Sequence, residues 1–96
     1  MDFDYKIKWI ESAEEELLKK AEFIFEQSKN KDIALKFIND IKENALKRLT
    51  LIAHSFNDKE IKFYTLLNGH RVKFFVEHNQ KTIYIIDFIA KGRNCH

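Results

Sequence analysis

The chain begins with an alternation of apolar and polar residues. Between residues 3 and 10, Tyr5, Ile7 and Trp9 fall on one face of an extended chain, and lysines lie between them. This period of two is typical of a strand that is buried on one side. We therefore predict a first strand at residues 5–10.

The next forty residues carry the spacing of two helices. Ser12 and Glu15 match a capping box, which predicts that the first helix begins at Ser12 and that the serine hydroxyl accepts from the Glu15 amide. Apolar residues then recur at helical spacing to residue 25 and again from residue 34 to residue 52. The polar segment 27–32 separates the two patterns, so we expect helices near 12–28 and 31–52 that pack side by side as an antiparallel hairpin.

The C-terminal third changes to the period of strands. Residues 61–67 and 71–76 are strand-like and are separated by Asn68 and Gly69, a pair that tolerates the positive φ angles of tight hairpin turns. Residues 82–90 are apolar at nearly every position, as expected of a strand buried on both faces. We predict strands near 60–67, 70–77 and 82–91.

Together these elements give the order βααβββ and an α+β fold. The chain has 96 residues, which suits a single domain over residues 1–96 with one layered core. We expect the two-helix hairpin to pack on one side of a four-stranded sheet dominated by antiparallel pairings.

The register of the predicted hairpin assigns its side chains to two faces. A two-residue turn at Asn68 and Gly69 would place Leu66 opposite Arg71 and Tyr64 opposite Lys73, and directly opposed residues share a face. The expected core face consists of Ile61, Phe63, Thr65, Val72, Phe74 and Val76. The expected outer face consists of Lys62, Tyr64, Leu66, Arg71, Lys73 and Phe75. Cations among aromatic rings suit phosphate neutralisation and base stacking, while the alternative interpretations are a solvated face and a docking surface for another protein.

The composition indicates the class of protein and the cellular compartment that we expect. The chain is 45% hydrophobic and 33% charged, with one cysteine, which indicates a globular domain without an internal disulfide. No apolar run reaches the roughly 18–20 residues that cross a bilayer, and the N-terminal acids do not match a signal peptide. We expect a cytoplasmic protein that does not enter a membrane.

Charge is distributed unevenly along the chain. Residues 1–58 contain 10 basic and 12 acidic side chains, whereas residues 59–96 contain 7 basic and 3 acidic ones. A basic C-terminal part favours an anionic target or partner, although an ordinary solvated surface would have the same composition. Arg93 and His96 can fold back over the sheet at Gly92, and the alternative is a frayed chain end.

The sequence contains no motif for a cofactor. The four histidines lack the spacing of a metal site, and no glycine-rich phosphate loop is present. We expect neither a metal nor an organic cofactor.

Three segments resemble the RelE/ParE toxin superfamily, and its ParE branch more closely. The segment ESAEEELLKKAEFIFEQSKNKDIALKFINDIKENALKRL is similar to the long helical hairpin of ParE, and HRVKFFV resembles the family strand Y-R-V-x-Y-x-V. The last strand, IYIIDFIAKGRN, resembles I-x-I-L-x-I-x-H-G-R-R. The resemblance covers residues 6–94, and the chain departs from the pattern at His70, Phe74, Lys91 and Asn94.

The resemblance implies a toxin of a type II toxin–antitoxin system that a cognate antitoxin neutralises. ParE-like members inhibit DNA gyrase without catalytic residues of their own, and the helical hairpin makes this our expected mechanism. RelE-like members cut mRNA on the ribosome; in that alternative Arg71 and Arg93 match the family arginines and His96 approximates its C-terminal acid. A third alternative is a non-toxic protein-binding module of the same fold. The target- or RNA-binding residues are expected to be Lys59, Lys62, Tyr64, Arg71, Lys73, Phe75, Lys91 and Arg93.

Overall fold

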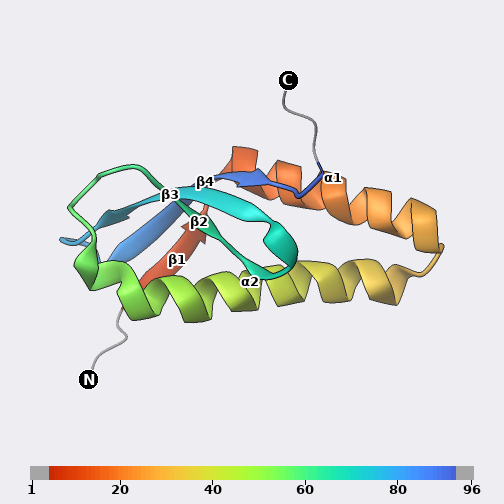
Figure 1. Cartoon of the computed structure of the whole chain (residues 1–96), viewed down its shortest axis with the longest axis horizontal. Coiled ribbons are helices and arrows are strands. Elements are labelled where there is room, and N and C mark those ends of the chain that lie inside the picture. Colours follow the sequence, from red (N-terminus) through yellow and green to blue (C-terminus); the bar gives the residue numbers. More distant parts are fainter. Residues whose placement is uncertain (1–4, 93–96) are drawn as a thin grey trace.

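The computed structural model describes residues 5–92 and has the predicted order of elements (Figure 1). The elements are β1 (Lys6–Trp9), α1 (Glu11–Ser28), α2 (Lys31–Ile52), β2 (Lys62–Thr65), β3 (Arg71–Glu77) and β4 (Thr82–Ile89). Short 3-10 turns lie at Ala53–Ser55 and Leu67–Gly69. The α+β class and the βααβββ order are therefore confirmed.

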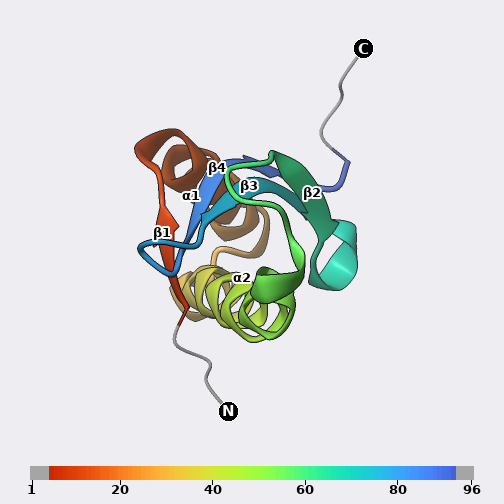
Figure 2. The same cartoon turned by 90° about the vertical axis from the view of Figure 1, so that its left-hand side faces the viewer.

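The four strands form one mixed sheet with the order β1-β4-β3-β2. β4 pairs in parallel with β1 and antiparallel with β3, and β3 pairs antiparallel with β2. The sheet curves around α2 (Figure 2). β4 lies inside the sheet, between β1 and β3. Its apolar sequence predicted burial on both faces, but only Thr82, Ile83, Ile85 and Phe88 are buried, and its other residues are half-buried.

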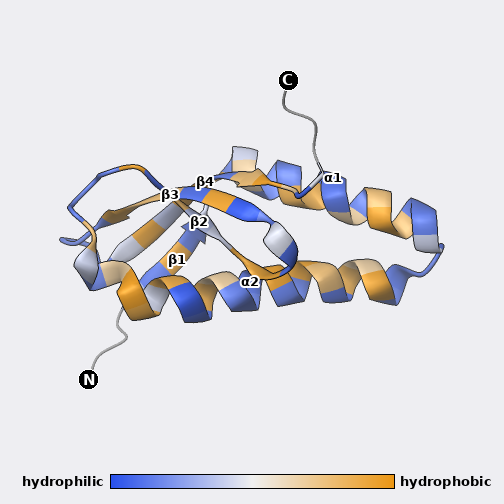
Figure 3. Cartoon of the chain, in the orientation of Figure 1, coloured by the Kyte–Doolittle hydropathy of each residue, from blue (hydrophilic) through white to orange (hydrophobic). Residues whose placement is uncertain are grey.

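One hydrophobic core joins both helices to the inner face of the sheet. α1 contributes Ala13 and Leu17, and α2 contributes Ile41, Ala45 and Leu49. The sheet contributes Val72, Phe74, Val76, Ile83, Ile85 and Phe88, all at 0% exposure. Apolar and polar residues alternate along both helices (Figure 3), so each helix has one face that burial stabilises.

Two adjacent residues form the tight connection between the helices. Lys29 ends α1 in the left-handed region at φ 56°, and its amide donates to the Phe25 carbonyl. The Asn30 side chain then caps α2 by accepting from the amides of Asp32 and Ile33. The two helices consequently run antiparallel and extend together beyond the sheet (Figure 1).

The predicted capping box at Ser12 and Glu15 is wrong. α1 begins at Glu11, its N-cap is Ile10, and no side chain caps it. The Ser12 hydroxyl instead donates to the Ile86 carbonyl over 3.0 Å. Ile86 lies where the β3–β4 register skips a residue, and a skipped residue leaves its backbone groups outside the ladder. A long-range bond in the sheet therefore takes the hydroxyl that the local pattern assigned to the helix.

The predicted hairpin register is also wrong, by one residue. Thr65 lies opposite Arg71 and Phe63 opposite Lys73. Asn68 and Gly69 do have the expected positive φ angles, 62° and 84°, but the turn also takes up Leu66 and His70, whose backbones are joined by a 2.6 Å hydrogen bond. The five-residue connection shifts the pairing by one position, and a one-residue shift moves every side chain of β2 to the other face.

His70 fastens the end of β4 to the hairpin turn. Its Nδ1 accepts from the Lys91 amide over 2.9 Å, and its ring packs edge-on to Phe37 and beside Phe88. Because a backbone amide can only donate, the neutral ring carries its proton on Nε2. Burial, followed by the charges of Lys20 and Lys91, lowers the pKa of His70 below its usual 6.5.

A pair of Phe→Ala substitutions tests the register. Phe63 is 52% exposed and Phe74 is 0% exposed, so Phe74→Ala should lower the free energy of unfolding by about 3–5 kcal/mol. Phe63→Ala should lower it by less than about 1 kcal/mol. Urea unfolding measures both values, and equal losses would mean that Phe63 faces the core, as a two-residue turn requires.

The pKa of His70 predicts a pH dependence of stability. Because burial lowers the folded-state pKa, the unfolded chain binds the proton more readily below about pH 6.5. The stabilisation is therefore complete above that pH and decreases as the pH falls toward the folded-state value. His70→Asn, which retains an acceptor but does not titrate, should weaken this decrease when urea unfolding is compared at pH 7.5 and 5.5. Identical pH slopes for the two proteins would contradict the prediction.

Candidate functional site

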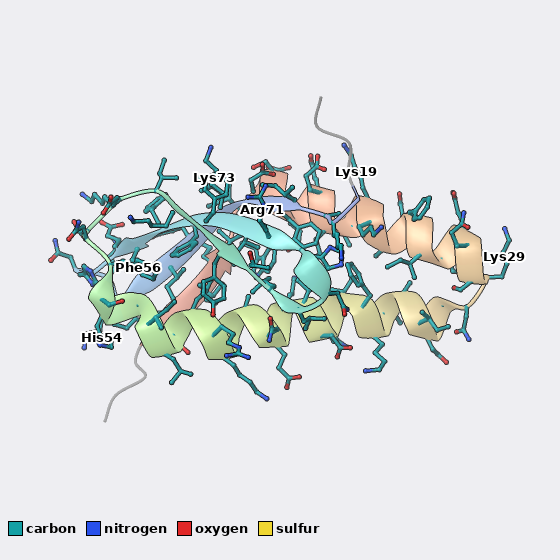
Figure 4. All side chains as sticks on the ribbon, viewed as in Figure 1. Lys19, Lys29, His54, Phe56, Arg71 and Lys73 are labelled. Carbon is teal, nitrogen blue, oxygen red and sulfur yellow. The ribbon has the colours of Figure 1, made fainter. Side chains whose placement is uncertain are left out.

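The observed register produces a basic and aromatic surface on the outer side of the sheet. Adjacent strands place Phe63 beside Lys73, Thr65 beside Arg71, and Phe75 beside Tyr84. We call the surface formed by Phe63, Arg71, Lys73, Phe75 and Tyr84 the basic–aromatic face. Arg71 and Lys73 point away from α2 (Figure 4); Arg71 is exposed, whereas Lys73 is half-buried and lies opposite Asp87 on β4.

The Phe63 ring makes cation–π contacts with both cations of the face. The Arg71 guanidinium carbon lies 5.5 Å from the centre of the Phe63 ring, and Lys73 Nζ lies 5.8 Å from it. Contacts of this kind contribute about 0.5–1 kcal/mol at exposed sites. One exposed ring on β2 therefore holds two cations from β3 close together.

The aromatic half of the face is a stacked pair. The rings of Phe75 and Tyr84 are 5.1 Å apart with an interplanar angle of 28°. The Tyr84 hydroxyl donates to the Gln80 side chain over 2.9 Å, and Lys8 of β1 lies beside Tyr84 on the same side. Together with Lys8, the face thus extends across all four strands and ends in a third cation.

The structure separates the predicted target-binding residues. Arg71, Lys73 and Phe75 lie on the basic–aromatic face, as expected. Lys62 and Tyr64 do not, because the register turns them to the inner side, where Tyr64 packs against the core. Assignment of these two residues to the outer face is therefore wrong.

Lys62 is also neutralised locally. Its Nζ lies 3.3 Å from a Glu60 carboxylate oxygen. A hydrogen bond from the Asn57 side chain, followed by the hydrogen bond and charge of Lys62, lowers the pKa of Glu60. Both partners are partly exposed, so this ion pair adds little stability, but it reduces the attraction of Lys62 for an anion.

Lys59 and Lys91 lie at opposite ends of the hairpin. Lys59 is an exposed residue with φ 62° whose amide donates to the Val76 carbonyl over 2.7 Å. Lys91 follows β4 and lies over the turn, where its Cδ is 2.7 Å from the position that a Cβ would take at Gly69. Glycine at this position therefore leaves room for the lysine. Arg93 and His96 lie outside the described residues.

The described part of the face provides charge and stacking but no imidazole. His70 is buried between Phe37 and Phe88. His78 accepts from the Tyr5 hydroxyl over 2.6 Å and donates to the Phe56 carbonyl over 2.7 Å, so both of its nitrogens are engaged. Within residues 5–92, no group of three His, Cys, Asp or Glu side chains can hold a metal ion. The described face can therefore bind an anion, whereas general acid–base chemistry would require residues beyond it.

Sequence reasoning missed three residues of this surface. Phe63 was placed in the core because the hairpin register was wrong by one residue. Tyr84 was not identified because its strand is apolar at nearly every position, and such a pattern does not show which residues face outward. Lys8 was on the polar side of β1, but only the parallel pairing of β1 with β4 brings it beside Tyr84. Of these three residues, only Lys8 had a usable sequence signal, which was the alternation of apolar and polar residues in β1.

A second surface is apolar and lies on the helical hairpin. It is a groove between α1 and α2, lined by Leu18, Ala21, Glu22, Phe25, Lys31, Ala34, Leu35 and Ile38. Phe25 and Leu35 are 44% and 48% exposed. Large apolar side chains grouped in this way on a surface are typical of protein–protein contacts. Neither helix is long and apolar enough to pass through a bilayer.

Comparisons of the sequence with known proteins give no match: no family model and no curated protein matches the chain. A solved structure does match. The fold is similar to that of a chain described as "Chromosomal ParDE TA system from P. aeruginosa", with a TM-score of 0.70 and 21% sequence identity. The similarity covers 93% of this chain and 98% of that chain. The chain therefore has the RelE/ParE-type fold, and its resemblance to the ParE branch is confirmed at the level of the fold.

Proposed function

We propose that this protein is the toxin of a type II toxin–antitoxin pair. The observation that carries the proposal is the similarity to the chromosomal ParDE chain, which extends over nearly the whole length of both chains. A match of this extent includes the long helical hairpin and the four-stranded sheet together. Because one fold can serve several functions, the toxin role depends on the tests below.

Inhibition of DNA gyrase is the mechanism that we favour. The basic–aromatic face offers an exposed and a half-buried cation over an aromatic ring, which suits docking on an anionic or acidic surface. Within residues 5–92 the face has no histidine to move a proton. An inhibitor that acts by binding needs none, and gyrase is a cytoplasmic target, so the proposal places the protein in the cytoplasm.

Ribosome-dependent mRNA cleavage is the second candidate. Arg71 beside Lys73 is the observation that supports it, because paired cations can stabilise the charge that develops at a phosphate during 2′-hydroxyl attack. In this mechanism Arg93 would add charge and His96 would transfer a proton. A non-toxic binding module of the same fold is the third candidate, and it would show neither activity.

We further propose that a cognate antitoxin covers the apolar groove of the helical hairpin. The groove exposes several large apolar side chains between Glu22 and Lys31. An amphipathic helix can bury such a groove with apolar residues at helical spacing. A partner segment of this kind would be disordered alone and would fold on binding.

A purified gyrase supercoiling assay tests the favoured mechanism. The wild-type protein should inhibit supercoiling, and Arg71→Ala with Lys73→Ala should weaken inhibition by about tenfold or more, because charged contacts at the centre of an interface dominate binding. Lys36→Ala with Lys47→Ala removes the same charge from exposed positions on α2 and is the matched control. If both double variants weakened inhibition of supercoiling equally, the loss would come from the lower net charge and not from the basic–aromatic face.

Deletion of His96 separates the two toxic mechanisms. The truncated protein should inhibit gyrase nearly as well as the wild type. A nuclease that uses His96 for proton transfer should instead lose roughly 10²–10⁴ of its rate. Induced expression followed by mapping of mRNA ends measures cleavage by the nuclease. Codon-phased cuts together with unaffected supercoiling would mean that the protein cleaves mRNA and does not inhibit gyrase.

The antitoxin proposal predicts a small partner encoded beside this gene. The partner should co-purify with the chain, and Phe25→Asp with Leu35→Asp should abolish the complex because each buries a charge in the groove. Leu46→Asp with Leu51→Asp, also at exposed positions, should leave it intact. A chain that has no small neighbouring gene and captures no product of one would contradict the proposal.

A further inference from the structure

A small polar cavity lies between α2 and the edge strand β2, away from both surfaces described above. It has a volume of about 280 Å³ and is lined by Asn44, Arg48, Tyr64, Thr65, Leu66 and Leu67. A water molecule occupies roughly 30 Å³ of liquid, so the cavity has room for a group the size of a phosphate. None of its lining residues carries a negative charge.

Asn44 is oriented by the backbone of the hairpin turn. Its Oδ1 accepts from the Leu67 amide over 3.0 Å. A backbone amide can only donate, so this contact identifies the oxygen and leaves the Asn44 NH₂ group as the free end. That NH₂ group has no hydrogen-bond partner within residues 5–92. The hairpin turn thus orients the Asn44 side chain so that its unpaired NH₂ group lies at the wall of the cavity.

Two further polar side chains of the cavity are also donors without a partner. Arg48 lies one helical turn after Asn44, on the same side of α2. Neither the Arg48 guanidinium nor the Tyr64 hydroxyl forms a hydrogen bond or ion pair with another described residue. No buried side-chain nitrogen or oxygen in the described part lacks a partner, so the unpaired Tyr64 hydroxyl must be open to solvent.

We propose that this cavity binds a phosphoryl group. Arg48 would supply the charge, and the Asn44 and Tyr64 side chains would supply two further donors from two different elements. A phosphoryl group presents three strong acceptor oxygens in a tetrahedral arrangement, whereas a carboxylate presents two in a plane. Arginine also binds phosphate through two parallel hydrogen bonds. The phosphoryl group can belong to free phosphate, a nucleotide or a nucleic-acid backbone, and the site does not depend on the toxin role.

Titration of the ¹⁵N-labelled chain, followed by NMR, tests the proposal. Inorganic phosphate, adenosine 5′-monophosphate and a short single-stranded oligonucleotide are the probes, and acetate at equal ionic strength is the comparison. We expect saturable shifts of the amides of residues 44, 48 and 65–67 with phosphate and the nucleotide. Tighter binding of the oligonucleotide at the same amides would identify a nucleic-acid backbone as the source, and equal or weaker binding a free phosphate or nucleotide.

Variants assign the binding to the cavity. Arg48→Ala should weaken phosphate binding by about tenfold or more, because a hydrogen bond to a charged group is lost. Tyr64→Phe, which keeps the packed ring, should weaken it roughly three- to tenfold. Lys47→Ala removes a neighbouring exposed cation of α2 and should have no effect. Non-saturable shifts, equal shifts with acetate, or an equal loss in Lys47→Ala and Arg48→Ala would each overturn the proposal.

Discussion

The register of the β2–β3 hairpin decides what each side of this sheet can do. Thr65 lies opposite Arg71 because the turn takes up the five residues between them. In this register Phe63 lies outside, beside Arg71 and Lys73, while Tyr64 turns inward and lines the cavity beside Arg48. A shift of one residue would exchange Phe63 and Tyr64 between the two sides. The basic–aromatic face and the donor-lined cavity both depend on this single pairing.

The central strand β4 connects the rest of the fold to that hairpin. It pairs with β1 on one side and β3 on the other, and its skipped residue, Ile86, is bonded by Ser12 at the start of α1. At its far end the Lys91 amide donates to His70, next to the hairpin turn. These two long-range hydrogen bonds hold the beginning of α1 and the end of β4 in place. His70 is one of the positions at which the chain departs from the family pattern, and its buried acceptor gives this departure a structural role.

Three surfaces of different chemistry lie on different parts of the molecule. The sheet presents cations over aromatic rings, the helical hairpin presents an apolar groove, and the α2–β2 edge presents unpaired donors. A partner helix in the groove would contact α1 and α2, whereas a target on the outer side of the sheet would contact β2 and β3. Neutralisation in such a protein therefore need not use the residues that contact the target.

The sequence by itself determined the elements and their order. Periods of two and of 3.6 predicted both helices and three of the strands closely, the apolar run of residues 82–90 predicted the last strand, and Asn68–Gly69 predicted a turn with positive φ angles. These features are local, because each depends on the conformation and burial of a few consecutive residues. Tertiary structure decided the hairpin register, the partner of Ser12, the neighbours of Lys8 and the position of Tyr64. Each of these depends on which distant backbone groups compete for a hydrogen bond, and one extra residue in a turn reverses a face without changing the periodicity of the sequence.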